Sequence, residues 1–172
     1  MQKYPQYSSK QKTIHWLSAL LVVIVVALLI FKVTLSPILG GMANIYLWHK
    51  SLGGVVFLFT VWRVIVISKD GVPDVLPKNK KLQRILAKST QGFLYILLFI
   101  LPLSGYLMSS RALNVFGLIS IPAIPMPNGL YGFFHSVHIV GSYLLAILVM
   151  LHIAGALYHY FWVKDKALQS ML

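Results

Sequence analysis

Four long apolar runs alternate with short polar segments along the chain. The runs cover residues 14–35, 45–67, 90–110 and 132–162. A helix of about twenty apolar residues crosses the hydrocarbon core of a bilayer. The pattern therefore predicts one domain over residues 1–172, with an all-α fold: an integral membrane four-helix bundle.

The segments between the runs carry helix-ending residues. Pro37 and the Gly40–Gly41 pair interrupt the first connection. Ser8 or Ser9 is a candidate N-cap for the first helix, and Asn44 for the second. The proline-containing, apolar segment 111–131 is expected to lie on the membrane surface or to fold over the mouth of the bundle.

The composition agrees with a membrane protein. The chain is 58% hydrophobic and 10% charged, whereas a soluble domain carries about 25% charged residues. It contains no cysteine, which excludes disulfides, CxxC sites and the CxxCH attachment of a c-type haem.

The formal charge of +12 indicates anionic lipid rather than nucleic acid, because the basic residues lie between apolar runs. They are concentrated in the N-terminal segment, in residues 68–89 and in the tail. The two connections on the other side contain only Arg111. Because basic segments stay in the cytoplasm, both termini are predicted to be cytoplasmic.

The last apolar run contains three histidines in helical register. Fourteen residues separate His138 from His152, and seven separate His152 from His159. Both spacings are close to whole numbers of turns, so the imidazoles share one stripe of a helix. His138 and His152 lie roughly 21 Å apart along the axis, which is most of a hydrocarbon core of roughly 30 Å.

The predicted topology pairs these histidines with two others. His49 and His138 both begin inward-running helices, so both lie near the outer face. His15 and His152 both lie toward the inner face. The second match requires the first helix to begin before Ile14, or the last helix to extend past the membrane interface.

A bis-histidine pair across a bundle is the arrangement that holds a b-type haem. A flat macrocycle also needs room, and small residues follow three of the candidate ligands by about one turn: Gly53 and Gly54, Gly141 and Ser142, and Gly155 and Ala156. The alternative is that these small residues are ordinary contacts between membrane helices.

A metal site or a proton relay is the main rival use of four membrane histidines. Either would usually add carboxylates. The chain has no Glu, and all three Asp lie in predicted cytoplasmic segments. The residues therefore favour haem over a haem-free transporter or metal carrier, which stays open as a further alternative.

The ordered motifs resemble the bacterial cytochrome b561 family over essentially the whole chain. They are IHW (14–16), WHKSLG (48–53), FGLISIP (116–122), FFHSVH (133–138) and LHIAGALYHYFW (151–162), with Pro102 and Gly105 in the third helix. The resemblance implies a multi-pass protein of the bacterial cytoplasmic (inner) membrane with two haem b groups. Its axial ligands would be His15, His49, His138 and His152, while His135 has no counterpart among them.

The family resemblance also implies a function. Such proteins move electrons between the ubiquinone pool and another donor or acceptor, and superoxide is the donor of some members. We therefore expect electron transfer between a periplasmic partner and ubiquinone, either as a superoxide:quinone-type oxidoreductase or as an electron carrier. The alternative is the membrane anchor subunit of a larger dehydrogenase or hydrogenase. A monomer and a homodimer are both open.

Two further residues are candidates at the inner side. Arg63 follows His49 by fourteen residues, so it shares that helix face and is a candidate partner for a haem propionate. The alternative, of equal weight, is that Arg63 is a basic residue that anchors the helix at the cytoplasmic interface. His159 is a candidate for inner-haem or quinone binding, because a group that titrates near neutral pH can pass a proton to reduced quinone. The alternative is that His159 is an ordinary histidine at the membrane interface.

Overall fold

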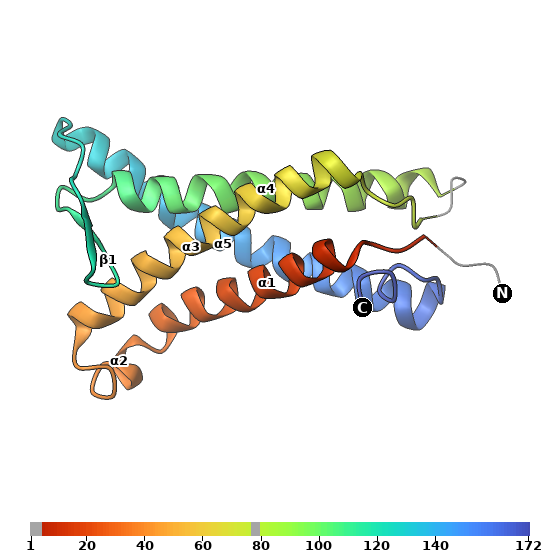
Figure 1. The fold of residues 1–172 in the computed structure, drawn as a ribbon, viewed down its shortest axis with the longest axis horizontal. Coiled ribbons are helices and arrows are strands. Elements are labelled where there is room, and N and C mark those ends of the chain that lie inside the picture. Colours follow the sequence, from red (N-terminus) through yellow and green to blue (C-terminus); the bar gives the residue numbers. More distant parts are fainter. Residues whose placement is uncertain (1–4, 77–79) are drawn as a thin grey trace.

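The computed structural model describes residues 5–76 and 80–172, and in these residues four helices are long and apolar enough to cross a membrane. Figure 1 shows them side by side. They are α1 (Ser9–Ile30), α3 (Met42–Asp70), α4 (Lys81–Leu107) and α5 (Asn128–Tyr158). A short α2 (Lys32–Leu35) follows α1, and a π-helical turn (His159–Val163) continues α5. The predicted four-helix membrane bundle is confirmed.

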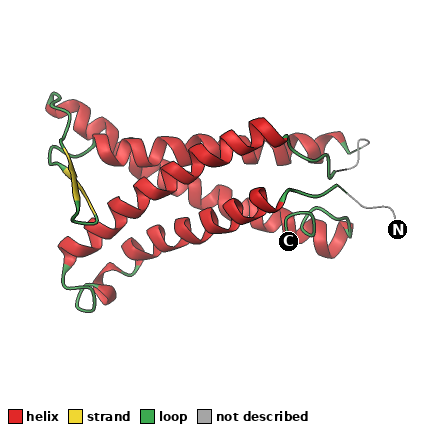
Figure 2. Ribbon diagram, viewed as in Figure 1, coloured by secondary structure: helices red, strands yellow, loops and turns green. Residues whose placement is uncertain are grey.

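The helices contact one another in a row. Close backbone contact joins α1 to α3, α3 to α4, and α4 to α5, whereas α5 makes little such contact with α1 or α3 in the described residues. Consecutive long helices run in opposite directions (Figure 1), and helices make up most of the fold (Figure 2). Close backbone contact therefore joins α5 to the rest of the bundle mainly through α4.

The first helix begins earlier than its apolar run, because Ser8 caps it. The backbone N–H of Gln11 donates to Ser8 Oγ (3.3 Å), and the backbone N–H of Ser8 donates to Gln11 Oε1 (2.9 Å). This capping box satisfies two amides that the helix itself leaves unpaired. The early start of α1 and the extension of α5 supply the depth match that the pairing of His15 with His152 requires.

Two other helix starts differ from the sequence pattern. Asn44 was expected to cap α3, but the N-cap is Gly41, at φ 109°. Glycine adopts this backbone conformation without a Cβ clash, so the helix begins earlier, and the Asn44 amide instead donates to Leu39 O (2.8 Å). Helix α4 begins at Lys81 rather than near Thr90, because the polar residues between them are mostly good helix formers.

A small β-hairpin interrupts the otherwise helical fold. Strand β1 (Leu113–Val115) pairs antiparallel with β2 (Ile119–Ile121). The hairpin lies over α3: the Phe116 N–H donates to Ser51 Oγ (2.8 Å), and the Phe116 and Trp48 rings lie 5.5 Å apart. Segment 111–131 therefore folds over the bundle mouth, one of its two expected positions. We call this end of the molecule the hairpin end.

At the opposite end, the C-terminal tail packs against α1 and the segment before it. The Tyr7 N–H donates to Ser170 O (3.2 Å), and the Trp16 indole N–H donates to Met171 O (3.0 Å). The Gln11 amide donates to Gly71 O (2.7 Å), which joins the end of α3 to the same assembly. We call this the terminal end.

Candidate functional site

The four paired histidines come together two by two. His49 of α3 faces His138 of α5, with ring centroids 6.2 Å apart and planes at 81°. His15 of α1 faces His152 of α5, also at 6.2 Å, with planes at 62°. The first pair lies toward the hairpin end and the second toward the terminal end. The structure thus brings together the residues that the predicted topology paired.

The 6.2 Å separation fits one metal ion between two imidazoles. A metal–imidazole bond is about 2.0 Å, and each ring nitrogen lies about 1.1 Å from its ring centre, so collinear coordination gives about 6 Å. No cluster of three or more His, Cys, Asp or Glu side chains occurs in the described residues. Two protein ligands per metal suit a haem iron, whose other four ligands belong to the macrocycle.

Hydrogen bonds orient both imidazoles of the hairpin-end pair. His49 Nδ1 lies 3.0 Å from the Val25 carbonyl oxygen of α1. His138 Nδ1 lies 2.9 Å from the Leu101 carbonyl oxygen of α4. Because a carbonyl only accepts, Nδ1 must carry the proton in each ring. Nε2 then presents its lone pair, which is the tautomer that ligates a metal.

The terminal-end pair contains an unpartnered polar atom. His15 Nδ1 is buried and has no hydrogen-bond partner in the part of the chain that the structure describes. Buried polar atoms are nearly always paired, so an exception calls for an explanation. Because Nε2 is the nitrogen that ligates a metal, the unpartnered Nδ1 means that no carbonyl of the described residues orients this ring, in contrast to His49 and His138.

The glycines separate into two kinds. A Cβ built on Gly53, Gly54 or Gly155 would meet no atom within 4 Å. On Gly141 it would lie 2.9 Å from Leu101 Cδ2. Gly141 is therefore a close contact between α5 and α4, as the alternative interpretation held. The other three leave open space about one turn from His49 and His152, as room for a macrocycle requires.

The separation of the helices agrees with this space. The histidines pair α5 with α3 and α5 with α1, and these helix combinations lack extensive backbone contact. A flat ring needs room of this kind between two imidazole-bearing helices. The residues of both pairs therefore fit haem b.

Gly105 is a site residue that sequence reasoning missed. A Cβ on Gly105 would lie 3.0 Å from His138 Cε1. The sequence showed Gly105 only as an interruption of a helix. Its contact with the imidazole depends on the register of α4 against α5, which no sequence motif reports.

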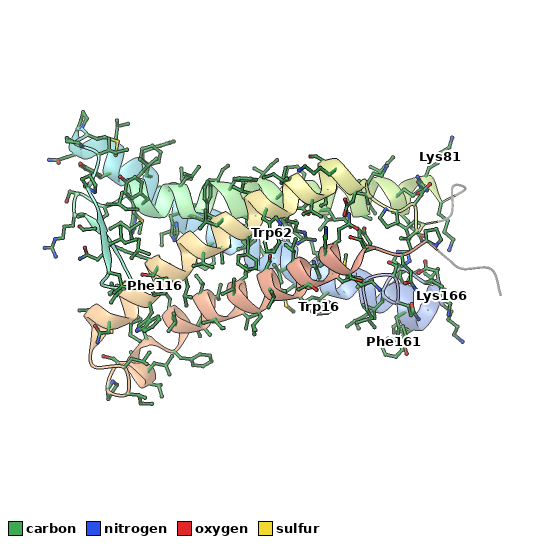
Figure 3. All side chains as sticks on the ribbon, in the orientation of Figure 1. Trp16, Trp62, Lys81, Phe116, Phe161 and Lys166 are labelled. Atoms are coloured by element: carbon green, nitrogen blue, oxygen red, sulfur yellow. The ribbon has the colours of Figure 1, made fainter. Side chains whose placement is uncertain are left out.

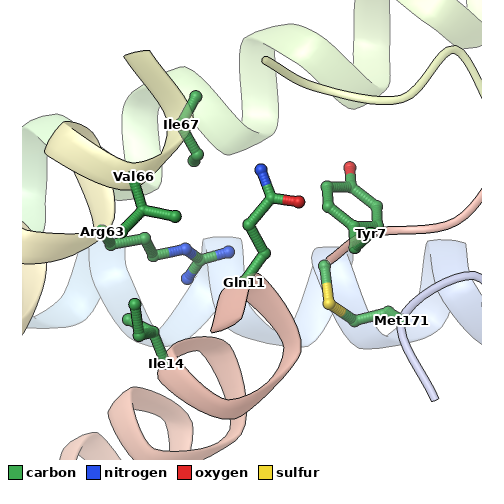
Figure 4. Close-up of a pocket in the computed structure, with 7 residues that line it drawn as sticks. All are labelled: Tyr7, Gln11, Ile14, Arg63, Val66, Ile67 and Met171. Atoms are coloured by element: carbon green, nitrogen blue, oxygen red, sulfur yellow. The ribbon is translucent and has the colours of Figure 1, made fainter. Parts of the chain in front are cut away.

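Arg63 lies toward the terminal end, where its guanidinium carbon is 5.1 Å from the centre of the Tyr95 ring. It lines a small pocket with Gln11, Tyr7 and Met171 (Figure 4). Burial raises the pKa of Tyr7, and the positive charge of Arg63 partly offsets that rise. The propionate partner and the interfacial anchor both remain compatible with this position.

His159 contacts a carboxylate of the C-terminal tail. Its Nδ1 lies 2.5 Å from Asp165 Oδ2, and the two side chains are 13% and 14% exposed. Asp165 Oδ1 also accepts the Ala167 N–H (2.9 Å). The histidine sits in the π-helical turn, a rare conformation that is frequent at functional sites. His135 is exposed and belongs to neither histidine pair.

Comparisons with known proteins agree with this geometry. A family model described as prokaryotic cytochrome b561 matches residues 6–172. The chain is 32% identical to cytochrome b561 homolog 2 of Escherichia coli K12, over 97% of this chain and 91% of the relative. It is 27% identical to a probable superoxide oxidase, CybB, of Yersinia pestis, over 98% of this chain and 97% of the relative.

Proposed function

Because the chain belongs to the prokaryotic cytochrome b561 family, and is therefore a multi-pass bacterial membrane b-type cytochrome of electron transfer, we propose that it carries two haem b groups. His49 and His138 ligate one, and His15 and His152 ligate the other. The equal 6.2 Å ring separation in the two pairs carries this proposal. The confirmed family resemblance supports haem over a transporter or metal carrier.

The protein residues fix the position and orientation of the bound groups. Haem iron, when bound, accepts or gives up one electron at a time. The carbonyls of Val25 and Leu101 hold the His49 and His138 rings in one tautomer and increase their basicity as ligands. Helix α5 supplies one ligand to each pair, so it sets the spacing between the two redox sites.

Single substitutions test the ligand assignment. Replacing His15, His49, His138 or His152 with Ala should leave one haem per chain, measured as the ratio of haem to protein after purification. His135→Ala is the matched control, because this exposed histidine lies outside both pairs; it should keep two haems and a low-spin spectrum. Full haem content in the four ligand variants would overturn the assignment.

We further propose that electrons pass between a periplasmic partner at the hairpin end and ubiquinone at the terminal end. The resemblance to a probable superoxide oxidase makes superoxide the first donor to test. Quinone reduction takes up protons as well as electrons, and His159 is the candidate proton donor at that end. Arg63 is the candidate partner of a propionate of the terminal-end haem.

The physiological partner is tested by stopped-flow reduction with superoxide and with quinol, side by side. Fast haem reduction by superoxide, followed by electron transfer to ubiquinone, supports the proposal. His159→Gln should slow the quinone-linked step and leave reduction by superoxide unchanged. Unchanged quinone rates would remove His159 from the mechanism, and a soluble subunit that co-purifies stoichiometrically would favour the membrane-anchor function.

The proposed location is the cytoplasmic membrane, with the terminal end in the cytoplasm. The basic residues of the terminal end support this orientation. A fluorescent reporter fused to the C-terminus should fluoresce, and an alkaline phosphatase fused there should be inactive. The opposite result would reverse the orientation.

A further inference from the structure

The beginning of α4 carries a basic face at the terminal end of the molecule. Lys81, Arg84, Ile85 and Lys88 line a shallow depression on the surface, and Figure 3 shows Lys81 at this end. Spacings of three, four and seven residues place these side chains on one side of a helix. The depression is thus formed by two turns of a single helix.

The arginine in this group already has partners. Arg84 Nη1 lies 2.6 Å from Asp74 Oδ1 and donates to Leu76 O, also at 2.6 Å. These bonds tie the segment before α4 onto the helix, and the Asp74 carboxylate offsets the charge of Arg84. The remaining positive charge of the depression belongs to Lys81 and Lys88, which are both exposed.

Exposed apolar side chains adjoin the lysines. Leu82, Ile85 and Leu86 are 69%, 61% and 57% exposed. Ile85 also lines the depression, so the basic and apolar surfaces meet there. The apolar surface continues along α4 through Phe93 and Ile96, which are 57% and 52% exposed. A molecule that covers both surfaces needs an anionic head and a long apolar tail.

We propose that this depression, the α4 lipid site, binds an anionic phospholipid of the adjacent leaflet. The phosphate oxygens accept hydrogen bonds from the ammonium groups of Lys81 and Lys88, and an acyl chain lies along Leu82, Leu86 and Phe93. Inorganic phosphate would use only the lysines. An acidic soluble protein would not cover apolar side chains that continue into a membrane-spanning helix. Interfacial basic residues with adjoining apolar side chains are the usual features of anionic lipid recognition.

Native mass spectrometry of the purified holoprotein tests the site. Phosphatidylglycerol and phosphatidylcholine with the same acyl chains are added in parallel. The wild type should retain phosphatidylglycerol preferentially. Lys81→Gln/Lys88→Gln should lower its apparent affinity about thirtyfold, since each interfacial lysine contributes about a fivefold preference. An unchanged haem spectrum shows that the variant is folded.

Lys10→Gln/Lys12→Gln is the matched control, because it removes the same charge from the start of α1 at the same end. This variant should bind phosphatidylglycerol as the wild type does. Leu82→Ser/Leu86→Ser should weaken binding of long-chain lipid more than that of a short-chain analogue. An excess of inorganic phosphate should not displace the lipid.

Four outcomes would overturn the proposal. They are equal retention of the two lipids, wild-type affinity in the Lys81/Lys88 variant, an equal loss in the Lys10/Lys12 control, and displacement by inorganic phosphate. The last would identify a simple anion site. None depends on the number of haems or on the quinone, so the lipid site and the proposed function are tested separately.

Discussion

Gly105 of α4 lies against the imidazole of His138, so that a Cβ atom at this position would be 3.0 Å from Cε1 and 3.2 Å from Nδ1 of the ring. Nδ1 is also the atom that hydrogen-bonds to the Leu101 carbonyl oxygen at 2.9 Å. A side chain at position 105 would therefore push on the ring and on the bond that orients it.

If His49 and His138 hold a haem as proposed, Gly105→Ala should disturb that haem selectively. The ring must move by a few tenths of an ångström, and such overpacking typically costs about 1–3 kcal/mol. We expect a changed spectrum and midpoint potential for one haem, with the other unaltered. Gly92→Ala is the control on the same helix, since its Cβ would meet no atom within 4 Å. Identical redox titrations of the two variants would contradict the contact.

If His15 and His152 hold a second haem as proposed, Gly155→Leu should remove it. This glycine lies less than one turn after His152, and open space faces its missing side chain; a leucine would fill the room that the macrocycle requires. We expect one haem per chain, with unchanged helical circular dichroism. Gly129→Leu serves as the control, because position 129 also faces open space but lies at the start of α5. Two haems in the Gly155 variant would show that this space is not used.

Ser8→Ala should destabilise the terminal end. The substitution removes the side-chain half of the capping box, and losing such a cap typically costs about 1 kcal/mol. It also removes the 3.2 Å hydrogen bond from Ser8 Oγ to Asp70 Oδ2, which links α1 to the end of α3. Thermal unfolding in detergent should begin at a lower temperature. Ser9→Ala, one position later, should behave as the wild type.

Tyr7 should make the protein less stable at alkaline pH. Burial raises its pKa above the ordinary value of 10.0. As the pH rises past that value, the unfolded chain loses the phenolic proton while the folded chain keeps it, so the free energy of unfolding falls. Tyr7→Phe should show a shallower loss of stability above about pH 10. Tyr46→Phe, at an exposed position, should leave the wild-type slope unchanged.

The sequence was most informative where a simple period governs the structure. Apolar runs of membrane length predict spanning helices, because the bilayer leaves few alternatives. The fourteen-residue spacing of His138 and His152 placed both on one stripe, and the alternating helix directions supplied a partner for each. The proximity of the rings in each pair could therefore be predicted without knowing how the side chains pack.

Features that depend on packing between helices were not predictable in this way. Gly105 meets His138 only because of how α4 and α5 are aligned. The contact between His159 and Asp165 requires the chain to turn at Lys164, which has φ 55°. Because this residue is not a glycine, the sequence did not indicate a turn there. The hairpin turn combines Gly117 at φ 73° with Phe116 at φ 52°, and the second conformation is rare for a bulky residue.

The row of contacts from α1 through α3 and α4 to α5 has a consequence for biosynthesis. Each spanning helix packs on the one that precedes it in the chain, so the polypeptide can assemble in the bilayer in the order in which it is synthesised. The two imidazole pairs are complete only after the last helix has entered the membrane. If both pairs bind haem as proposed, cofactor loading is the closing step of maturation, and a chain truncated before Asn128 would insert into the membrane without either group.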